Sequence, residues 1–257
     1  MKTDFCLNKQ HIGTDFAILQ RGKDLRECFR SDRKAIISMN ESEKDLKATQ
    51  QVKSKKRVAE HGEVFTNERE VNAMLDLVKH ETERIDSRFL EPACGNGNFL
   101  VEVLRRKLGV VDSRYGKSQI EWERYAVIAV SSIYGVDILE DNALECQERL
   151  FSIFSKIYLG KFGTNCKLEF IKSIKFILKR NILWGDALDF TNPITKKPIV
   201  FSEWSMVTEN MIKRRDFVFK FLVEKTHQFS IFNDEGNPAA IDEPVKDFPL
   251  IHFLKLG

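Results

Sequence analysis

The chain has 257 residues, of which 42% are hydrophobic and 31% charged, a composition typical of a globular protein and not of a collagen-like, mucin-like or wholly disordered one. The formal net charge of +3 is too small by itself to indicate a nucleic-acid partner. No run approaches the roughly 18 to 20 consecutive apolar residues of a membrane-spanning helix, and the first residues lack the apolar core of a secretory signal, so we expect a cytoplasmic protein without membrane contact.

The first part of the chain, residues 1–57, is polar and dense in charge, and we expect a charged helical extension there. A helix is predicted from Asn40 to Arg57, because Asn40 or Ser42 can cap it and acidic residues occupy its first turns. Basic residues in its last turn match the helix dipole: Lys53, Lys55, Lys56 and Arg57. This basic cluster either contacts DNA phosphates or is a solvated helix end, and the second interpretation is favoured.

From Val58 onward, helical and extended patterns alternate, which predicts a core domain over residues 58–222. Thr66 is expected to cap a helix whose apolar residues recur at helical spacing: Val71, Met74, Leu75 and Val78. A short extended run, Arg88 to Leu90, then ends in Glu91 and Pro92.

The later part of this core repeats the alternation of helix and strand. After the turn ACGNGN the expected elements are a helix carrying Phe99, Leu100, Val103, Leu104 and Leu108, a helix over 118–132, a strand over 133–137, helices over 140–157 and 168–179, and a strand over 181–184. Strands that alternate with helices indicate parallel strands joined by right-handed crossovers. The predicted fold class is therefore α/β.

The tail, residues 223–257, is rich in Asp, Glu, Pro and scattered Phe, and it is expected to be a docking or loop segment rather than sheet. The pairs Phe229/Phe232 and Phe248/Phe253 either pack on the edge of the core, which is favoured, or fill a groove in a partner. The five cysteines form neither a CxxC pair nor a cluster at zinc spacing, so reduced thiols and no metal site are expected.

Three successive predicted strands end in an acid, at Glu91, Asp137 and Asp186. Ligands of open parallel sheets bind beyond the carboxyl ends of the strands, and Gly95 and Gly97 would let the backbone approach a ligand there. The turn contains neither GxGxxG nor GxxxxGK[ST], and an acid repels phosphate, whereas it suits an amino group and ribose hydroxyls. These features favour S-adenosylmethionine as the cofactor.

The segment from Glu91 to Leu100, EPACGNGNFL, resembles the cofactor loop of the N6-adenine DNA methyltransferases of restriction-modification systems. The stretch from His61 to Thr66 is similar to the Gly-x-x-Phe/Tyr-Thr-Pro element of that family, with Asn67 in place of proline. The resemblance implies a Rossmann-like class I methyltransferase sheet. It also implies these cofactor-binding residues: Phe65, Thr66, Glu91, Pro92, Ala93, Gly95, Asn96, Gly97, Asp137, Ile138, Asp186 and Ala187.

The roles that the resemblance implies differ along this set. Phe65 and Thr66 would border the methionine end of the cofactor. Asp137 would hold the ribose hydroxyls, with Ile138 beside the adenine. Asp186, in the segment Gly-Asp-Ala-Leu, would face the adenine amino group.

The family's catalytic motif, Asn/Asp/Ser-Pro-Pro followed by an aromatic residue, is missing, because all six prolines of the chain are isolated. Three other segments are candidates for the same role. The segment 192–194 (Asn-Pro-Ile) fits a plain turn, 202–204 (Ser-Glu-Trp) fits simple packing, and 216–219 (Asp-Phe-Val-Phe) resembles the start of the family's fourth strand but supplies no amide afterwards. No catalytic residue is assigned. Too few residues follow Phe219 for the roughly three further strands of a complete enzyme, so the sheet is expected to be incomplete.

The sequence thus leads to two hypotheses. In the preferred one, the chain is an S-adenosylmethionine-dependent adenine-N6 DNA methyltransferase, or its cofactor-binding subunit, with double-stranded DNA as substrate and a second protein supplying the catalytic motif and target recognition. In the alternative, it is a non-catalytic scaffold or regulatory subunit of a restriction or defence complex. Methylation of a small molecule or a protein is a weaker third interpretation.

Overall fold

The computed structural model describes residues 53–208, 210–224 and 244–257, all within one compact unit, Gln51–Gly257. The predicted extension therefore lies outside the described residues up to residue 52. At its end the prediction of a helix running to Arg57 is wrong, because Ser54 is extended (φ −161°, ψ 154°) and caps a separate helix, α3 (Lys55–His61), by accepting a hydrogen bond from the Arg57 N–H. The basic residues thus lie around the beginning of α3.

The next helix, α4 (Glu68–Leu77), is capped by Asn67 and not by Thr66. The Asn67 side chain accepts a hydrogen bond from the Arg69 N–H at 2.9 Å, and Glu70 closes a capping box by accepting from the Asn67 N–H at 3.2 Å. A glutamate three residues after Asn67 makes it the better cap. Of the predicted apolar stripe only Val71 and Leu75 are buried, whereas Met74 and Val78 are exposed. A single turn, α5 (Lys79–Thr82), follows.

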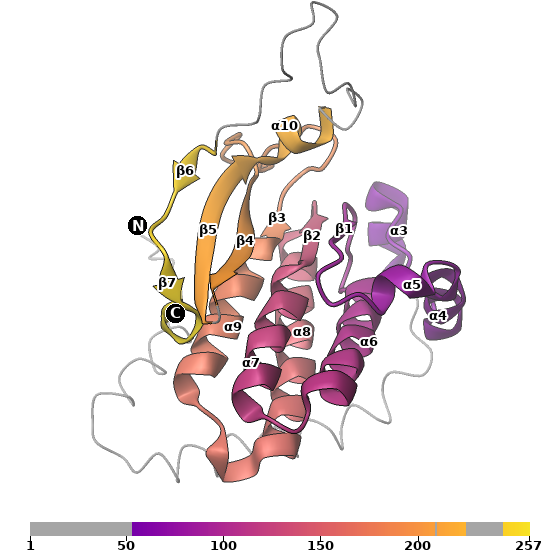
Figure 1. The fold of residues 1–257 in the computed structure, drawn as a ribbon. Helices are drawn as coiled ribbons and strands as arrows, with labels where there is room; N and C mark the ends of the chain where they lie inside the picture. Colours follow the sequence, from indigo (N-terminus) through magenta and orange to yellow (C-terminus); the bar gives the residue numbers. More distant parts are fainter. Residues whose placement is uncertain (1–52, 209, 225–243) are drawn as a thin grey trace, which may run out of the picture. The chain divides into compact units, whose positions relative to one another are not determined.

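Three parallel strands form the predicted α/β sheet: β1 (Phe89–Glu91), β2 (Ile133–Asp137) and β3 (Ile182–Trp184), with β2 in the middle (Figure 1). The pairs Phe89/Ile133 and Gly135/Ile182 fix the register. Each crossover contains two helices, first α6 (Asn98–Tyr115) and α7 (Gln119–Ser131), then α8 (Glu140–Phe162), a short turn η1 (Gly163–Asn165) and α9 (Leu168–Asn181). The parallel α/β architecture is confirmed, and α8 is one turn longer than predicted.

Strand β2 is buried along its whole length because both faces of the sheet are covered. Ile133 belongs to the main core, which contains the fully buried aromatic residues Trp122, Phe154 and Phe170 of the helices. On the other face, Tyr134 and Val136 pack against a smaller cluster of Ile199, Phe201 and Phe219. Successive side chains of β2 point to opposite faces of the sheet, so β2 packs against the helices on one face and against residues that follow β3 on the other.

Buried Lys107 of α6 fixes the approach to β1. Its ammonium donates to the Ile85 carbonyl at 3.2 Å, to the Ser87 carbonyl and to the Ser132 hydroxyl, and its side chain is fully buried. Burial lowers the pKa of Lys107 to about 7. One side chain thus ties the residues before β1 to the junction between α7 and β2.

The remaining strands form a separate antiparallel sheet. Its elements are β4 (Val200–Thr208), β5 (Met211–Val218), β6 (Lys246–Asp247) and β7 (Ile251–His252), with the short helix α10 (Phe219–Glu224) after β5 and the turn η3 (Phe253–Lys255) at the end. The segment 216–219 is therefore not a fourth parallel strand, because Asp216 pairs with Ser202 of β4 in antiparallel register and the chain turns into α10 at Phe219.

The tail prediction is wrong for its described part, since both β6 and β7 pair with β5. Phe253 is fully buried against Phe170, and the Phe248 ring lies 4.1 Å from the Arg214 guanidinium. Packing on the core is confirmed for Phe253, whereas Phe248 belongs to neither core cluster and lies against Arg214. Phe229 and Phe232 lie outside the described residues. Within the described part of the chain, no helix combines the length and the apolar character needed to cross a bilayer.

Candidate functional site

The turn between β1 and α6 depends on two glycines. Gly95 and Gly97 have φ of +52° and +89°, in the left-handed region that favours glycine. A Cβ on Gly97 would lie 2.6 Å from the Cys146 Sγ, and a Cβ on Gly95 would lie 3.2 Å from the Phe65 ring. Helix α6 begins immediately afterwards at Asn98, so its free N–H groups open beside the turn.

Helix α8 stabilises this turn through hydrogen bonds from Arg149. The Arg149 guanidinium donates to the Asn96 carbonyl at 2.7 Å and to the Asn98 side-chain oxygen at 2.8 Å. The Asn98 amide in turn donates to the Thr66 carbonyl at 2.9 Å. The structure therefore brings Thr66 and Phe65 against the glycine turn, and their expected place beside the methionine end of a cofactor stays a prediction. Arg149 was missed; the only signal was an arginine next to the apolar Leu150 on a predicted amphipathic helix.

Asp137, at the end of β2, points toward the glycine turn and is 6% exposed. One carboxylate oxygen accepts from the Gly95 N–H at 2.8 Å; the other accepts from the Leu139 N–H at 2.9 Å and from the Asn142 amide at 3.3 Å. A carboxylate has about four acceptor positions, so three are in use. One position is left for a ribose hydroxyl, on the oxygen that accepts from Gly95, and a second hydroxyl would have to replace one of these donors.

A charged network next to Asp137 was not found from the sequence. The Arg57 guanidinium makes two hydrogen bonds to the buried Glu63 carboxylate (2.6 and 2.7 Å) and two to Asp141 at the beginning of α8 (2.6 and 3.1 Å). The Asn142 amide also donates to Glu63, at 2.7 Å. Burial opposes ionisation of Glu63, but the hydrogen bonds from Arg57 and Asn142 outweigh it and hold its pKa below the ordinary value.

Of the other described basic residues near Arg57, only Lys53 contacts the acids of α8. Lys53 pairs with Glu145 of α8 at 2.7 Å. Lys56 is exposed and lies 3.8 Å from Glu60 within α3. Lys53 and Arg57 are thus neutralised by acids of this chain, which leaves Lys55 and Lys56 facing solvent.

The other predicted residues lie along the carboxyl edge of the sheet. Glu91 is half-buried, and burial raises the pKa of its carboxyl against the opposing hydrogen bond from the Ala93 N–H. Pro92 and Ala93 are exposed beside it, and Ile138 is 46% exposed after β2. This edge therefore presents one partly desolvated acid flanked by apolar groups.

At the end of β3 the structure gives the predicted residues local roles. The Asp186 carboxylate accepts from the N–H groups of Leu188 and Asp189, at 2.8 and 3.3 Å, and so holds its own turn. Ala187 packs against the smaller core cluster. The Trp184 indole donates to the Ile138 carbonyl at 3.0 Å and ties the ends of β2 and β3 together.

The first two substitutes for the missing catalytic motif behave as the sequence favoured. The Asn192 side chain accepts from the N–H groups of Ile194 and Thr195, which makes a turn. Trp204 is 8% exposed, and its indole donates to the Asn181 side chain at 2.9 Å. Trp204 is therefore not open to a flipped base, and the Asn192 side-chain oxygen is used within its own turn.

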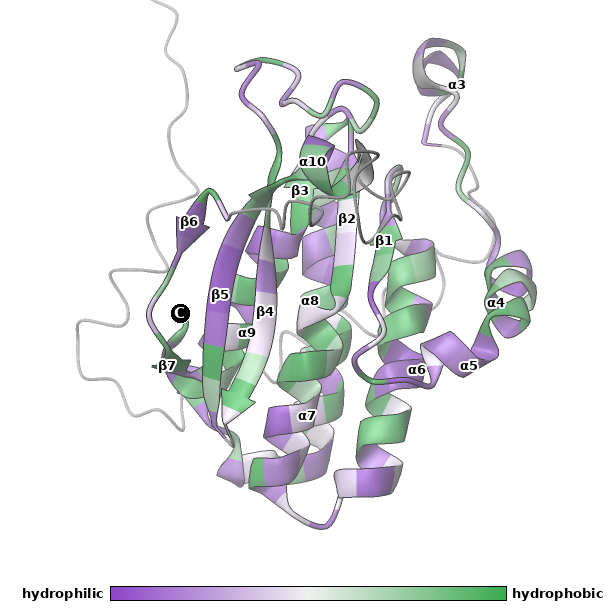
Figure 2. Ribbon diagram, turned by 45° about the horizontal axis from the view of Figure 1, so that its top comes forward, coloured by the Kyte–Doolittle hydropathy of each residue, from purple (hydrophilic) through white to green (hydrophobic). Residues whose placement is uncertain are grey.

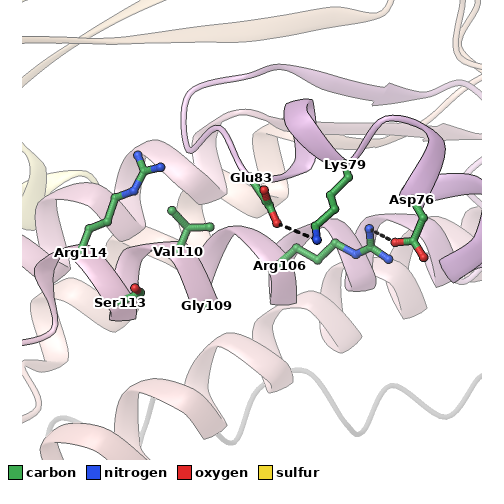
Figure 3. A pocket seen from close by; sticks show the side chains of 8 residues that line it. All are labelled: Asp76, Lys79, Glu83, Arg106, Gly109, Val110, Ser113 and Arg114. Carbon is green, nitrogen blue, oxygen red and sulfur yellow. Dashed lines mark ion pairs between the residues drawn. The ribbon is translucent and has the colours of Figure 1, made fainter.

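Two cavities lie away from the glycine turn. One of about 380 Å³ is walled by α4, α5 and α6, and four of its five charged residues form pairs, Arg106 with Asp76 at 2.8 Å and Lys79 with Glu83 at 3.6 Å (Figure 3). The other, of about 370 Å³, lies beside Tyr134 and Trp204. No residue of the predicted site lines either cavity, and the described residues contain no cluster of three or more metal ligands.

No family model, curated protein or solved structure matches this chain.

Proposed function

We propose that this chain is an S-adenosylmethionine-dependent DNA methyltransferase acting on adenine N6, or the cofactor-binding subunit of one, in a restriction-modification or defence system. The observation that carries the proposal is the glycine turn. Gly95 and Gly97 both have positive φ, the turn joins a parallel strand to a helix, and Phe65 packs against it. A backbone without Cβ atoms at a helix N-terminus suits a ligand that approaches the main chain closely.

The hydrogen-bond acceptors and the apolar side chain at this edge suit most parts of that cofactor. Glu91 would accept hydrogen bonds from the amino group of the methionine moiety, and the exposed Ile138 would cover one face of the adenine. Asp137 would accept from one ribose hydroxyl at its remaining acceptor position, and from a second once the Asn142 amide, its longest contact at 3.3 Å, has moved away. When bound, the cofactor supplies an electrophilic methyl group on sulfur; the residues of this chain bind and orient it.

A second protein is proposed to complete the enzyme. The sequence has no Pro-Pro motif, and β4 and β5 form their own antiparallel sheet instead of extending the parallel one. Strand β1 is one of the two edge strands of the parallel sheet, and its Leu90 is 44% exposed. These features leave room at β1 for a strand that carries the base-binding motif. Double-stranded DNA would be the substrate of the assembled enzyme.

Isothermal titration with S-adenosylmethionine tests the cofactor site. Ile138→Ser is expected to weaken binding roughly tenfold, because about 1.5 kcal/mol of apolar burial against adenine is lost. Ile120→Ser is the matched control: Ile120 is 37% exposed, beyond the far end of the 18-residue helix α6, and its change should leave the affinity unaltered. Equal affinities for both variants would remove Ile138 from the site.

Methyl transfer is tested with tritium-labelled donor and unmethylated genomic DNA, first with this chain alone and then with candidate partner proteins. Label that appears on DNA only with a partner supports a divided enzyme. The scaffold alternative is favoured by one observation, the occupied acceptor positions of Asp137. Absence of any heat with S-adenosylmethionine would decide for that alternative.

A further inference from the structure

Helix α9 presents a row of lysines to solvent. Lys172, Lys175 and Lys179 are all exposed, and at 100° per residue they lie within an arc of about 60°. The buried residues Ile174 and Ile177 lie on the opposite side of the helix, against the core. The helix packs against α7, α8, β4 and η3, and its three lysine side chains remain exposed.

The charge of this surface is not balanced. Helix α9 contains four basic residues and one acidic residue, Glu169, a surplus of three positive charges that equals the formal net charge of the whole chain. Within the described part of the protein, no acid forms an ion pair with any of the four basic side chains, Lys172, Lys175, Lys179 and Arg180. On α6, by contrast, both Arg105 and Arg106 pair with Glu102.

Two of these cations are held by aromatic rings. The Lys175 ammonium lies 5.4 Å from the centre of the Phe151 ring, and the Arg180 guanidinium lies 5.4 Å from that of Phe176. A ring face attracts a cation without cancelling its charge. These contacts therefore restrain the side chains and keep their charge available to a partner.

The lysine row is unfavourable for the isolated helix. Lys172 and Lys175 are three residues apart, and Lys175 and Lys179 four, the spacings at which like charges on a helix repel. The helix dipole accounts for Lys179 and Arg180 in the last turn but not for Lys172 and Lys175 earlier in the helix. Uncompensated repulsion on one face is expected where an anionic partner binds.

We infer that this basic face of α9, made of Lys172, Lys175 and Lys179 with Arg180 to one side of it, binds the phosphate backbone of double-stranded DNA. A row of ammonium groups rising about 4.5 and 6 Å between neighbours faces a regular array of negative charges, and lysine acts on phosphate as a point charge without reading sequence. The choice of duplex DNA among polyanions rests on the proposed function. The surface then anchors the protein to DNA while sequence is read elsewhere.

The test is the salt dependence of binding of the full chain to a fluorescein-labelled DNA duplex, followed by anisotropy. The triple variant Lys172→Gln, Lys175→Gln, Lys179→Gln is expected to reduce the slope of log Kobs against log salt by about 2.7, and so to weaken binding by two to three powers of ten near 0.1 M salt. The matched control, Lys55→Gln, Lys56→Gln, Lys117→Gln, removes the same charge from other exposed positions and should leave the slope unchanged. The triple change to arginine should retain it.

Several results would overturn the inference: an unchanged slope in the α9 variant, an equal reduction in the control, or binding to anionic phospholipid vesicles that depends on the three lysines while duplex DNA is not bound. The outcome is separable from that of the proposed function. If S-adenosylmethionine gives no heat but the DNA slope falls as expected, the methyltransferase proposal fails and the DNA surface stands. If methyl transfer occurs and the slope does not fall, the methyltransferase proposal stands and the DNA surface on α9 is refuted.

Discussion

Replacing Arg57 by alanine is expected to destabilise the protein through the carboxylate it leaves behind. The Glu63 side chain is 6% exposed, and without Arg57 it would keep only the hydrogen bond from Asn142. Removing one partner of a fully buried ion pair costs about 3 to 5 kcal/mol. Arg57 is itself 24% exposed and Asp141 is 54% exposed, so solvent screens the pair and we expect a smaller cost of about 2 to 3 kcal/mol.

Urea unfolding followed by circular dichroism at pH 7 would measure this loss, which corresponds to a fall in Tm of about 5 to 10 °C. The double variant Arg57→Ala, Glu63→Gln removes the stranded charge and should recover part of the lost free energy. The pKa of Glu63 is lowered from 4.5, so its contribution is present above that value and disappears as the pH falls through the folded-state pKa. The effect of Arg57→Ala should therefore shrink in acid.

A loss of less than about 0.5 kcal/mol at pH 7, or strictly additive effects in the double variant, would refute this reasoning. Either result would mean that Glu63 is hydrated in the folded protein and that the network contributes no more than surface ion pairs do.

Three further predictions concern glycine, arginine and lysine positions. Gly97→Ala should destabilise the protein by about 2 kcal/mol or more, because φ is +89° and the new Cβ would meet the Cys146 Sγ at 2.6 Å. Gly109→Ala, at a helical position with no atom within 4 Å, should stabilise the protein by about 0.5 to 1 kcal/mol. Thermal melts of the two variants measure the difference. Arg149→Met should speed amide exchange in the glycine turn about tenfold by freeing the Asn96 carbonyl, as mass spectrometry would show. Folding lowers the pKa of Lys107 from 10.5 to about 7, so between these pH values the unfolded chain binds more protons than the folded protein. The free energy of unfolding should therefore rise with pH in this range, by at most about 1.4 kcal/mol per pH unit. Thermal melts at several pH values should show a flatter rise for Lys107→Met.

The sequence predicts the parallel half of the fold because its signals are local. Strand β2 is a short apolar run closed by an acid, and α9 has buried residues at helical spacing opposite its lysines. The antiparallel half escapes prediction because β5 contains four consecutive charged residues, Lys213 to Asp216, which Figure 2 shows in the hydrophilic colour. Their partners are distant in sequence: Asp247 pairs with Lys213, and Glu203 pairs with Arg215.

The candidate site divides in the same way. The glycine turn and its acids could be predicted, since β1, the turn and the beginning of α6 are continuous in the chain. The contacts that determine its shape could not, because Arg57 reaches Asp141 across 84 positions and Arg149 reaches Asn96 across 53. A motif specifies which groups meet a ligand, whereas their orientation depends on contacts formed only in the folded chain.

The attachment of α3 has a consequence for how the chain responds to its surroundings. Arg57 and Lys53 hold this helix to α8 through charged groups, and among residues 54–60 the only partly buried apolar side chain is that of Val58. Charged contacts near the surface weaken as ionic strength rises, whereas the apolar core does not. Concentrated salt should thus release α3 first, and a lysine-directed protease would then cut at Lys55 and Lys56 while the remainder stays folded.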